Sequence, residues 1–191
     1  MAKQRITREM IVNAAFQIAQ QEGIGSVQVK RIADALECSV QPIYSYCTNM
    51  DDLRAAVVEK ANDHMQAYMA CHINPEEPFR STGFAYVHYA KAEPHLFQLF
   101  LQRKRPYVGT LTDLYQKDAD PRVPQVIAQR LGISLQRAME LHLNMLVYTT
   151  GIGEIMTTSA DGLSEQELTN RLEGAYQAFL QYALRKEEDQ K

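Results

Sequence analysis

Residues 40–45 carry side chains that suit contact with a double-stranded nucleic acid. Gln41, Tyr44 and Ser45 offer hydrogen-bonding groups, and Val40 offers an apolar surface. Proteins contact base edges and phosphates with this mixture of hydrogen bonds and apolar contacts. For these side chains to act together they must share the exposed face of one short helix, so the neighbouring elements have to position that helix.

The stretch that begins at Val29 predicts two short helices joined by a tight turn. Apolar residues recur at helical spacing before a break at residues 37–39 and again after it. Ala33 is small enough for the helices to approach closely, Ile43 is expected to fill the gap between them, and Ser39 is expected to cap the second helix. Two such helices form a helix-turn-helix, whose second helix fits a DNA major groove.

Helical periodicity continues through the rest of the chain, and almost nothing alternates with the period of two that strands show. A first helix is expected from Thr7, a good N-cap, to Glu22, where Gly23 ends it. Asn49 is expected to cap a fourth helix that is long enough to act as a connector. The break at residues 74–78, which contains two prolines, is the expected domain boundary.

Beyond this break the pattern predicts five further helices, at about residues 79–92, 94–104, 121–132, 134–158 and 164–187. The sequence therefore predicts an all-α protein of about nine helices. The expected organisation is a small helix-turn-helix domain at residues 1–50, a connecting helix at 51–74 and a larger helical domain at 75–191.

The charge of the chain does not by itself indicate a nucleic-acid binder. The 191 residues carry a net charge of −3, with 46% hydrophobic and 23% charged residues, which is typical of a globular protein. Over residues 1–55, six cations and six anions cancel, and only Lys3, Arg5 and Arg8 form a basic cluster. DNA binding would therefore depend on a few well-placed contacts rather than on a broad basic surface.

Short motifs follow one another in a fixed order over residues 7–58. They are Ala-Ala at 14–15, Ile-Ala at 32–33, Ser39, Ile-Tyr at 43–44, Tyr46 and Asn-x-Asp-Asp-Leu at 49–53. In this order they resemble the N-terminal DNA-binding domain of the TetR family of transcriptional regulators. The segment from Phe84 to Phe97 resembles the start of the ligand-binding domain in part of that family.

Four residues depart from the family pattern. Glu37 stands where the family usually has the glycine of the turn, and Gln28 stands where Ser or Thr usually caps the second helix. Cys47 replaces a usual aromatic residue, and Thr48 replaces a frequent lysine. These departures concern the affinity for DNA more than the fold.

The resemblance implies a homodimer that binds a palindromic DNA operator and holds an unknown small-molecule effector in its C-terminal ligand-binding and dimerisation domain. Effector binding would move the fourth helix and release the DNA. Val40 and Gln41 would face bases, whereas Tyr44 and Tyr46 would contact phosphates or sugars. The full set of candidate DNA contacts is Lys30, Ser39, Val40, Gln41, Tyr44, Ser45, Tyr46, Thr48 and Asn49.

The last predicted helix has a wide apolar stripe over residues 168–184. Such a stripe serves the core alone or the core together with a subunit interface. We expect the second, because a dimer with two-fold symmetry suits a palindromic operator. The expected interface residues are Leu168, Leu172, Tyr176, Phe179 and Ala183.

Polar and soft side chains on the predicted helices of the larger domain have two interpretations. They are either satisfied core residues or the lining of an effector pocket, which is mostly apolar with a few placed polar groups. The candidate pocket residues are His88, Tyr89, His95, Tyr107, His142, Met145 and Tyr148. No two of the five histidines stand four residues apart, and no Cys or carboxylate cluster joins them, so no metal is expected.

A second stretch, Val126 to Ser134, also has the spacing of a helix-turn-helix. The helix that follows it is apolar on most faces, which indicates a buried helix rather than one that contacts DNA. Gly132 is therefore expected to end one helix, and Ser134 is expected to cap the next.

Other classes of function find little basis in the sequence. Three cysteines, at 38, 47 and 71, indicate a reducing compartment rather than disulfides or zinc. Cys38 and Cys47 flank the second helix of the helix-turn-helix. They have two interpretations, a redox switch or, more simply, small buried residues. We expect no membrane span, no cofactor and no catalytic set.

The sequence thus favours a cytoplasmic, dimeric transcriptional repressor that a small molecule releases from DNA. The alternative is a dimeric small-molecule-binding protein of the same fold whose DNA affinity has weakened and which acts through a protein partner.

Overall fold

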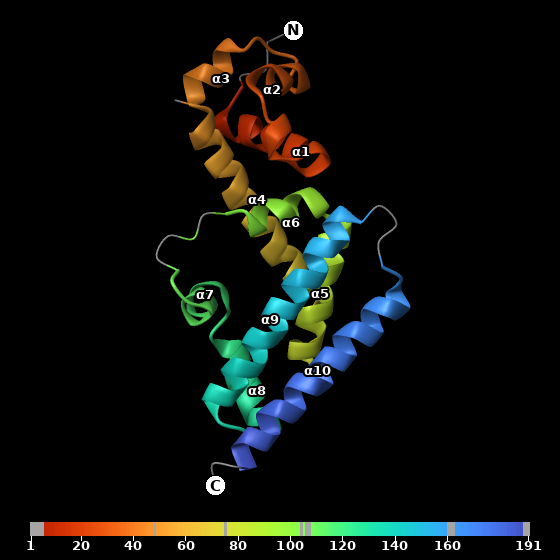
Figure 1. Ribbon diagram of the computed structural model, residues 1–191. Coiled ribbons are helices and arrows are strands. Elements are labelled where there is room, and N and C mark those ends of the chain that lie inside the picture. The colour runs from red at the N-terminus through yellow and green to blue at the C-terminus, as the bar shows by residue number, and fades with distance from the viewer. Residues whose placement is uncertain are drawn as a thin grey trace. The chain divides into compact units, whose positions relative to one another are not determined.

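The computed structural model describes residues 6–47, 49–74, 76–103, 105, 108–159 and 163–188. These residues form ten α-helices and one short 3₁₀ helix, and the described ranges contain no strand (Figure 1). This architecture confirms the all-α fold class that the periodicity predicts.

The chain divides into two compact units. The first runs to Tyr68 and includes Ala92–Arg103, and the second comprises Met69–Lys91 and the described residues after Arg103. The helices of the first unit are α1 (Arg8–Glu22), η1 (Ile24–Ser26), α2 (Val29–Ala35), α3 (Gln41–Tyr46), most of α4 (Met50–His72) and α6 (Pro94–Leu101). The helices of the second unit are α5 (Pro78–Ala92), α7 (Leu111–Asp118), α8 (Arg122–Leu131), α9 (Leu135–Thr158) and α10 (Glu165–Glu188).

Helix α1 is the centre of the first unit. It begins where predicted, because the Thr7 hydroxyl accepts a hydrogen bond from the Met10 N–H at 3.2 Å. It ends at Gly23, whose φ of 84° suits glycine. Its apolar face packs against α2, α3 and α6, and the Gln20 amide donates a 2.8 Å hydrogen bond to Glu93 at the start of α6. Helix α6 thus belongs to the unit that holds the helix-turn-helix.

The second unit is built on α9, which packs against α7, α8 and α10 and runs beside α10 (Figure 1). Gly132 ends α8 in the left-handed conformation with φ 65°, and the Ser134 hydroxyl caps α9 by accepting from the Arg137 N–H at 3.4 Å. Both predictions for this turn are confirmed. Ala138, Leu141 and His142 of α9 are buried, so this second motif is part of a core.

Helix α7 has no counterpart among the predicted elements. Its start carries a full capping box, in which the Asp113 N–H donates to the Thr110 hydroxyl at 3.1 Å and the Thr110 N–H donates to the Asp113 carboxylate at 2.9 Å. Its apolar pattern is weak, because Leu111 is 59% exposed whereas Tyr115 is buried. A short helix with one buried anchor leaves little periodicity in the sequence.

Candidate nucleic-acid interface and ligand cavities

The turn between α2 and α3 has the geometry of a helix-turn-helix. The Cys38 N–H donates to the Ala33 carbonyl at 3.0 Å, which closes the end of α2. Glu37 has a φ of 49° and is the only residue other than glycine with a positive φ in the described ranges. This is the position where the family resemblance expects glycine, so Glu37 holds a left-handed conformation that costs an L-residue energy.

Packing of α3 against the unit follows the sequence prediction. Ile43 is buried on the inner side of α3, and Ile32 and Ala33 are buried on α2. Each fully buried isoleucine side chain contributes about 1.5–3 kcal/mol. These three residues therefore fix which face of α3 points outward.

The predicted cap of α3 is wrong. Val40 occupies the N-cap position in a helical conformation, and no side chain caps α3, so Ser39 lies outside the helix. Pro42 lies in the first turn of α3, where its missing N–H costs no helical hydrogen bond. The start of α3 thus depends on proline geometry rather than on a serine cap.

Most candidate DNA contacts lie on the exposed surface of α2, α3 and their flanks. Tyr44 is 65% exposed, and Val40 and Tyr46 are 42% and 40% exposed. The exposed polar members of the set are Lys30, Ser39, Gln41, Ser45 and Asn49. The remaining candidate, Thr48, lies outside the described residues.

Two of these polar residues also make local contacts. The Ser45 hydroxyl donates to the Gln41 carbonyl at 3.0 Å, which leaves its lone pairs as acceptors. The Asn49 side-chain oxygen accepts from the Asp52 N–H at 2.8 Å, so Asn49 caps the start of α4 as predicted. Its amide NH₂ group, a double donor, is the part suited to a phosphate oxygen.

Few cations of the first unit are available for DNA. Arg31 forms two hydrogen bonds with Glu22, which lower the pKa of that carboxyl, and Arg54 lies 3.3 Å from Asp51. Lys30 is exposed, and no ion pair joins it to another residue in the described part of the chain. A nucleic-acid interface at α3 would therefore rely on placed polar and aromatic groups rather than on a broad basic surface.

The cysteines beside α3 differ in their surroundings. Cys47 is buried, and this burial raises the pKa of its thiol, whereas Cys38 is half-buried. A protonated thiol is a poor nucleophile, so Cys47 suits the interpretation as a small buried residue.

The candidate pocket residues lie at different places in the described part of the chain, and their role in effector binding stays a prediction. His95 belongs to the first unit, and Tyr107 lies outside the described residues. Tyr89 is fully buried, and Tyr148 packs edge-on against Phe179 with ring centroids 6.4 Å apart. These positions face different neighbours because each helix packs against several others.

His142 is a core histidine. Its Nδ1 atom lies 2.8 Å from the hydroxyl oxygen of Tyr115, and its ring meets those of Tyr115 and Phe79 edge-on. Burial lowers the pKa of His142 to about 4 and raises the pKa of Tyr115 to about 12, so both are neutral near pH 7. The pair joins α7 to α9.

The remaining two candidates border separate hollows of the second unit. His88 lies at an open depression of about 290 Å³, and its ring contacts Glu165 of α10 at 2.9 Å. Met145 borders a narrow gap that holds little more than 10 Å³.

A different cavity, of about 390 Å³, lies among the start of α5, the end of α8 and the middle of α10. Its apolar lining is Phe79, Val126, Ile127, Leu131 and Tyr176, and its polar lining is Glu76, Glu77, Arg80, Arg130, Glu173 and Gln177. None of these residues is in the predicted pocket set. The hint in the sequence is the acidic pair inside the proline-bounded break before α5.

The predicted dimer residues also pack against other helices of the same chain. Leu168, Leu172 and Ala183 are 1%, 3% and 2% exposed. Tyr176 packs against the Phe79 ring, and Phe179 packs against the core cluster around Leu141 and Ala183. Helices α5, α8 and α9 of the same chain thus cover part of the apolar stripe of α10, whereas Leu184 stays 38% exposed.

The described residues hold neither a metal-binding cluster nor a membrane-spanning helix. In the described residues, no three His, Cys, Asp or Glu side chains come together in a way that would hold a metal ion. None of the described helices is both long and apolar enough to span a bilayer.

Solved structures share this architecture. The chain is similar to a TetR-like transcriptional regulator from Rhodococcus sp. RHA1, with a TM-score of 0.59 and 14% identity over 95% of this chain and 98% of that one. It is also similar to a TetR transcriptional regulator from Streptomyces coelicolor, with a TM-score of 0.54 and 17% identity over 94% of each chain. No family model and no curated protein matches the sequence. The chain therefore has the fold of TetR-like transcriptional regulators over nearly its whole length.

Proposed function

We propose that the protein is a transcriptional repressor that binds a palindromic operator as a homodimer and is released by a small-molecule effector. The observation that carries this proposal is the outward face of α3, with Tyr44 65% exposed beside Val40 and Gln41, in a chain with the fold of TetR-like regulators. A repressor of this kind acts in the cytoplasm, where its operator lies.

In this proposal α3 enters the major groove. Val40 and Gln41, at the N-terminal end of α3, contact base edges, because recognition helices present this end to the bases. Tyr44, Tyr46 and Asn49 contact phosphates or sugars on either side. Lys30 adds one exposed charge from α2.

A different face of α9 and α10 supports the homodimer. Val147, Gly151 and Ile155 form an exposed stripe on α9, and Gly174, Ala178 and Tyr182 form one on α10. A Cβ atom added at Gly151 or Gly174 would meet nothing within 4 Å, so packing within the chain does not explain these two helical glycines. Glycine in a helix costs about 1 kcal/mol relative to alanine, and close approach of a second copy would account for it.

Binding to the DNA just upstream of the protein's own coding region tests the repressor role. The measurement compares this duplex with an unrelated one at two salt concentrations. The proposal expects selective binding that weakens at least about tenfold between 50 and 200 mM salt, because phosphate contacts release counterions. Equal, weak binding to both duplexes would contradict it for this DNA.

The second candidate is a dimeric small-molecule-binding protein with weakened DNA affinity that acts through a protein partner. The strained Glu37 and the paired arginines Arg31 and Arg54 favour it. If selection from a pool of random DNA duplexes enriches no sequence and the protein is still a dimer, this candidate is supported over the repressor.

A further inference from the structure

The cavity among α5, α8 and α10 joins an apolar wall to an acidic rim. We propose that it binds a small organic cation with an apolar body, such as an aryl-alkyl amine. Binding of this ligand class does not depend on the function proposed above. A role of the ligand as the effector that releases DNA does rest on that proposed function.

The size and the apolar wall suit such a ligand. The volume of about 390 Å³ lies within the usual range of small-molecule pockets, about 300–1,000 Å³. Phe79 and Tyr176 supply two aromatic rings whose centroids are 5.5 Å apart, and Ile127 continues the wall into the core of the unit. An aryl or alkyl group bound here would transfer from water to an apolar surface, which is favourable.

The charges on the rim favour a cation. Three carboxylates, from Glu76, Glu77 and Glu173, face two guanidinium groups, from Arg80 and Arg130, so the lining carries one excess negative charge. Aromatic faces next to these carboxylates add to the attraction, because the ring quadrupole also favours cations.

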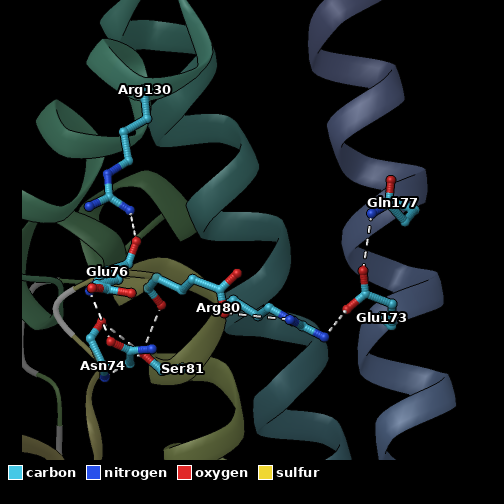
Figure 2. Close-up of polar contacts among 8 residues, drawn as sticks. Asn74, Glu76, Arg80, Ser81, Arg130, Glu173 and Gln177 are labelled. Carbon is cyan, nitrogen blue, oxygen red and sulfur yellow. Dashed lines mark hydrogen bonds and ion pairs between the residues drawn. The ribbon is translucent and has the colours of Figure 1, made fainter.

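Both arginines are already engaged. Figure 2 shows Arg80 extending to Glu173 of α10, with the ion pair at 3.1 Å, and Arg80 also lies 3.5 Å from Glu77. Arg130 donates a hydrogen bond to the backbone carbonyl of Glu76 (Figure 2). An anionic ligand would have to displace these partners, whereas a cation would add to them.

Two carboxylates retain acceptor capacity. Glu173 Oε1 accepts from the Gln177 amide at 3.0 Å, whereas Oε2 is buried and lies 3.1 Å from the Arg80 guanidinium as an ion pair but accepts no hydrogen bond. A buried acceptor without a hydrogen bond is costly, and an ammonium N–H would satisfy it. The Glu76 carboxylate is exposed and has no hydrogen-bonding or ion-pair partner among the described residues.

The rim is also held in place from α4. The Asn74 N–H donates to the Ser81 hydroxyl at 2.8 Å, and the Glu76 N–H donates to the Asn74 side chain at 2.9 Å (Figure 2). These bonds fix the segment between the end of α4 and the first turn of α5. A ligand that binds Glu76 therefore acts on residues next to the end of α4 in the chain.

Calorimetric titration with 4-phenylbutylamine and with 4-phenylbutyrate tests the site, since the two probes share one body and differ in charge. We expect the amine to bind at least about tenfold more tightly than the acid. The double variant Glu76→Gln/Glu173→Gln should lose at least about tenfold in amine affinity. Glu154→Gln, at an exposed glutamate of α9 outside the cavity, should bind the amine as the wild type does.

Equal binding of the two probes, no binding of the amine at millimolar concentration, or an unchanged affinity in the double variant would overturn the proposal. Thermal unfolding of each variant checks that the fold is retained. The titration contains no DNA, so a failure to bind operator leaves its result intact. Amine binding without release of operator would keep the site and contradict only the effector role.

Discussion

Tyr44 places a large aromatic side chain on the exposed face of α3. An aromatic side chain that is 65% exposed adds little to the core of its own unit. It lies one residue from the buried Ile43, so the packing of α3 holds it outward. A rigid aromatic ring with a hydroxyl group suits contact with a DNA backbone.

The Tyr44→Ala variant should bind operator DNA at least about tenfold more weakly, because a lost hydrogen bond to a charged phosphate costs about 1.5–3 kcal/mol. Its free energy of unfolding should change by less than about 0.5 kcal/mol, since the side chain is exposed. Fluorescence anisotropy with a labelled operator measures the first quantity. Tyr44→Phe separates the ring from the hydroxyl, and retained operator affinity in Tyr44→Ala would remove α3 from the interface.

His142 should make the stability of the second unit depend on pH. Its pKa is about 4 in the folded chain, whereas the ordinary value is 6.5, so the unfolded chain binds more protons below pH 6.5. The stabilisation is complete above pH 6.5 and is lost as the pH falls toward 4. Between pH 7 and pH 5 the free energy of unfolding should fall by about 2 kcal/mol from this group.

Urea unfolding of the wild type and of His142→Gln at both pH values measures this effect. The variant should show a smaller loss on acidification, because it lacks the titrating ring. His72→Gln, at an exposed histidine of α4, is the matched control and should lose as much as the wild type. Equal losses in all three proteins would remove His142 as the cause.

Individual residues were predictable from the sequence where their role is local. Thr7, Asn49, Gly132 and Ser134 end or cap helices through neighbours within four residues, and the structure confirms each of them. Ser39 was expected to cap α3, but the helix starts one residue later than such a cap requires. Cap chemistry is visible in the sequence, whereas the exact register of a helix start is not.

The turn of the helix-turn-helix belongs to the scale of elements. Glu37 has a left-handed backbone conformation there, which glycine would adopt without strain. Glu37→Gly should raise the free energy of unfolding, because it removes a strain of about 1 kcal/mol. The higher conformational entropy of glycine in the unfolded chain offsets part of this gain. Glu37→Ala keeps the strained backbone and should bring no such gain. Urea denaturation measures both, and equal stabilities in the two variants would contradict the strain.

Whole elements were predictable where the helical apolar pattern is long, on one face in α1 and α10 and on most faces in α9. Helix α7 was missed because it has one buried anchor, Tyr115, although the capping box at Thr110 and Asp113 is visible in the sequence. The stripe of α10 was expected to serve both the core and a subunit interface, and Phe179 and Ala183 of this stripe pack in a core cluster of the same chain. Periodicity shows that a face is buried and does not show which neighbour buries it.

At the scale of the whole molecule, the cavity between α5, α8 and α10 could not be predicted from periodicity in the sequence either. Its wall comes from three helices that are far apart in the sequence, α5, α8 and α10, and its rim includes the residues just before α5. Only the tertiary packing brings Glu76, Arg130 and Glu173 together. The histidines and tyrosines of the predicted pocket set lie at other positions, and a tyrosine outside that set, Tyr176, lines this cavity.

The homodimer is a proposal at this scale, and Val147→Glu tests it. A charge buried in the exposed α9 stripe would lack a partner in a dimer, so light scattering should report the mass of a monomer. Leu135→Glu changes an equally exposed apolar residue of α9 that lies off this stripe, and it should leave the dimer intact. A dimeric Val147→Glu protein would place the interface elsewhere.

Selection of bound sequences from a pool of random DNA duplexes tests the central claim most directly. The account predicts an enriched inverted repeat, because two copies of α3 related by two-fold symmetry would read two half-sites about 34–36 Å or a multiple of this apart. The Tyr44→Ala protein should bind the enriched repeat at least about tenfold more weakly than the wild type. If the wild-type protein enriches no sequence, or only a motif without two-fold symmetry, the proposal of a dimeric DNA-binding repressor is contradicted.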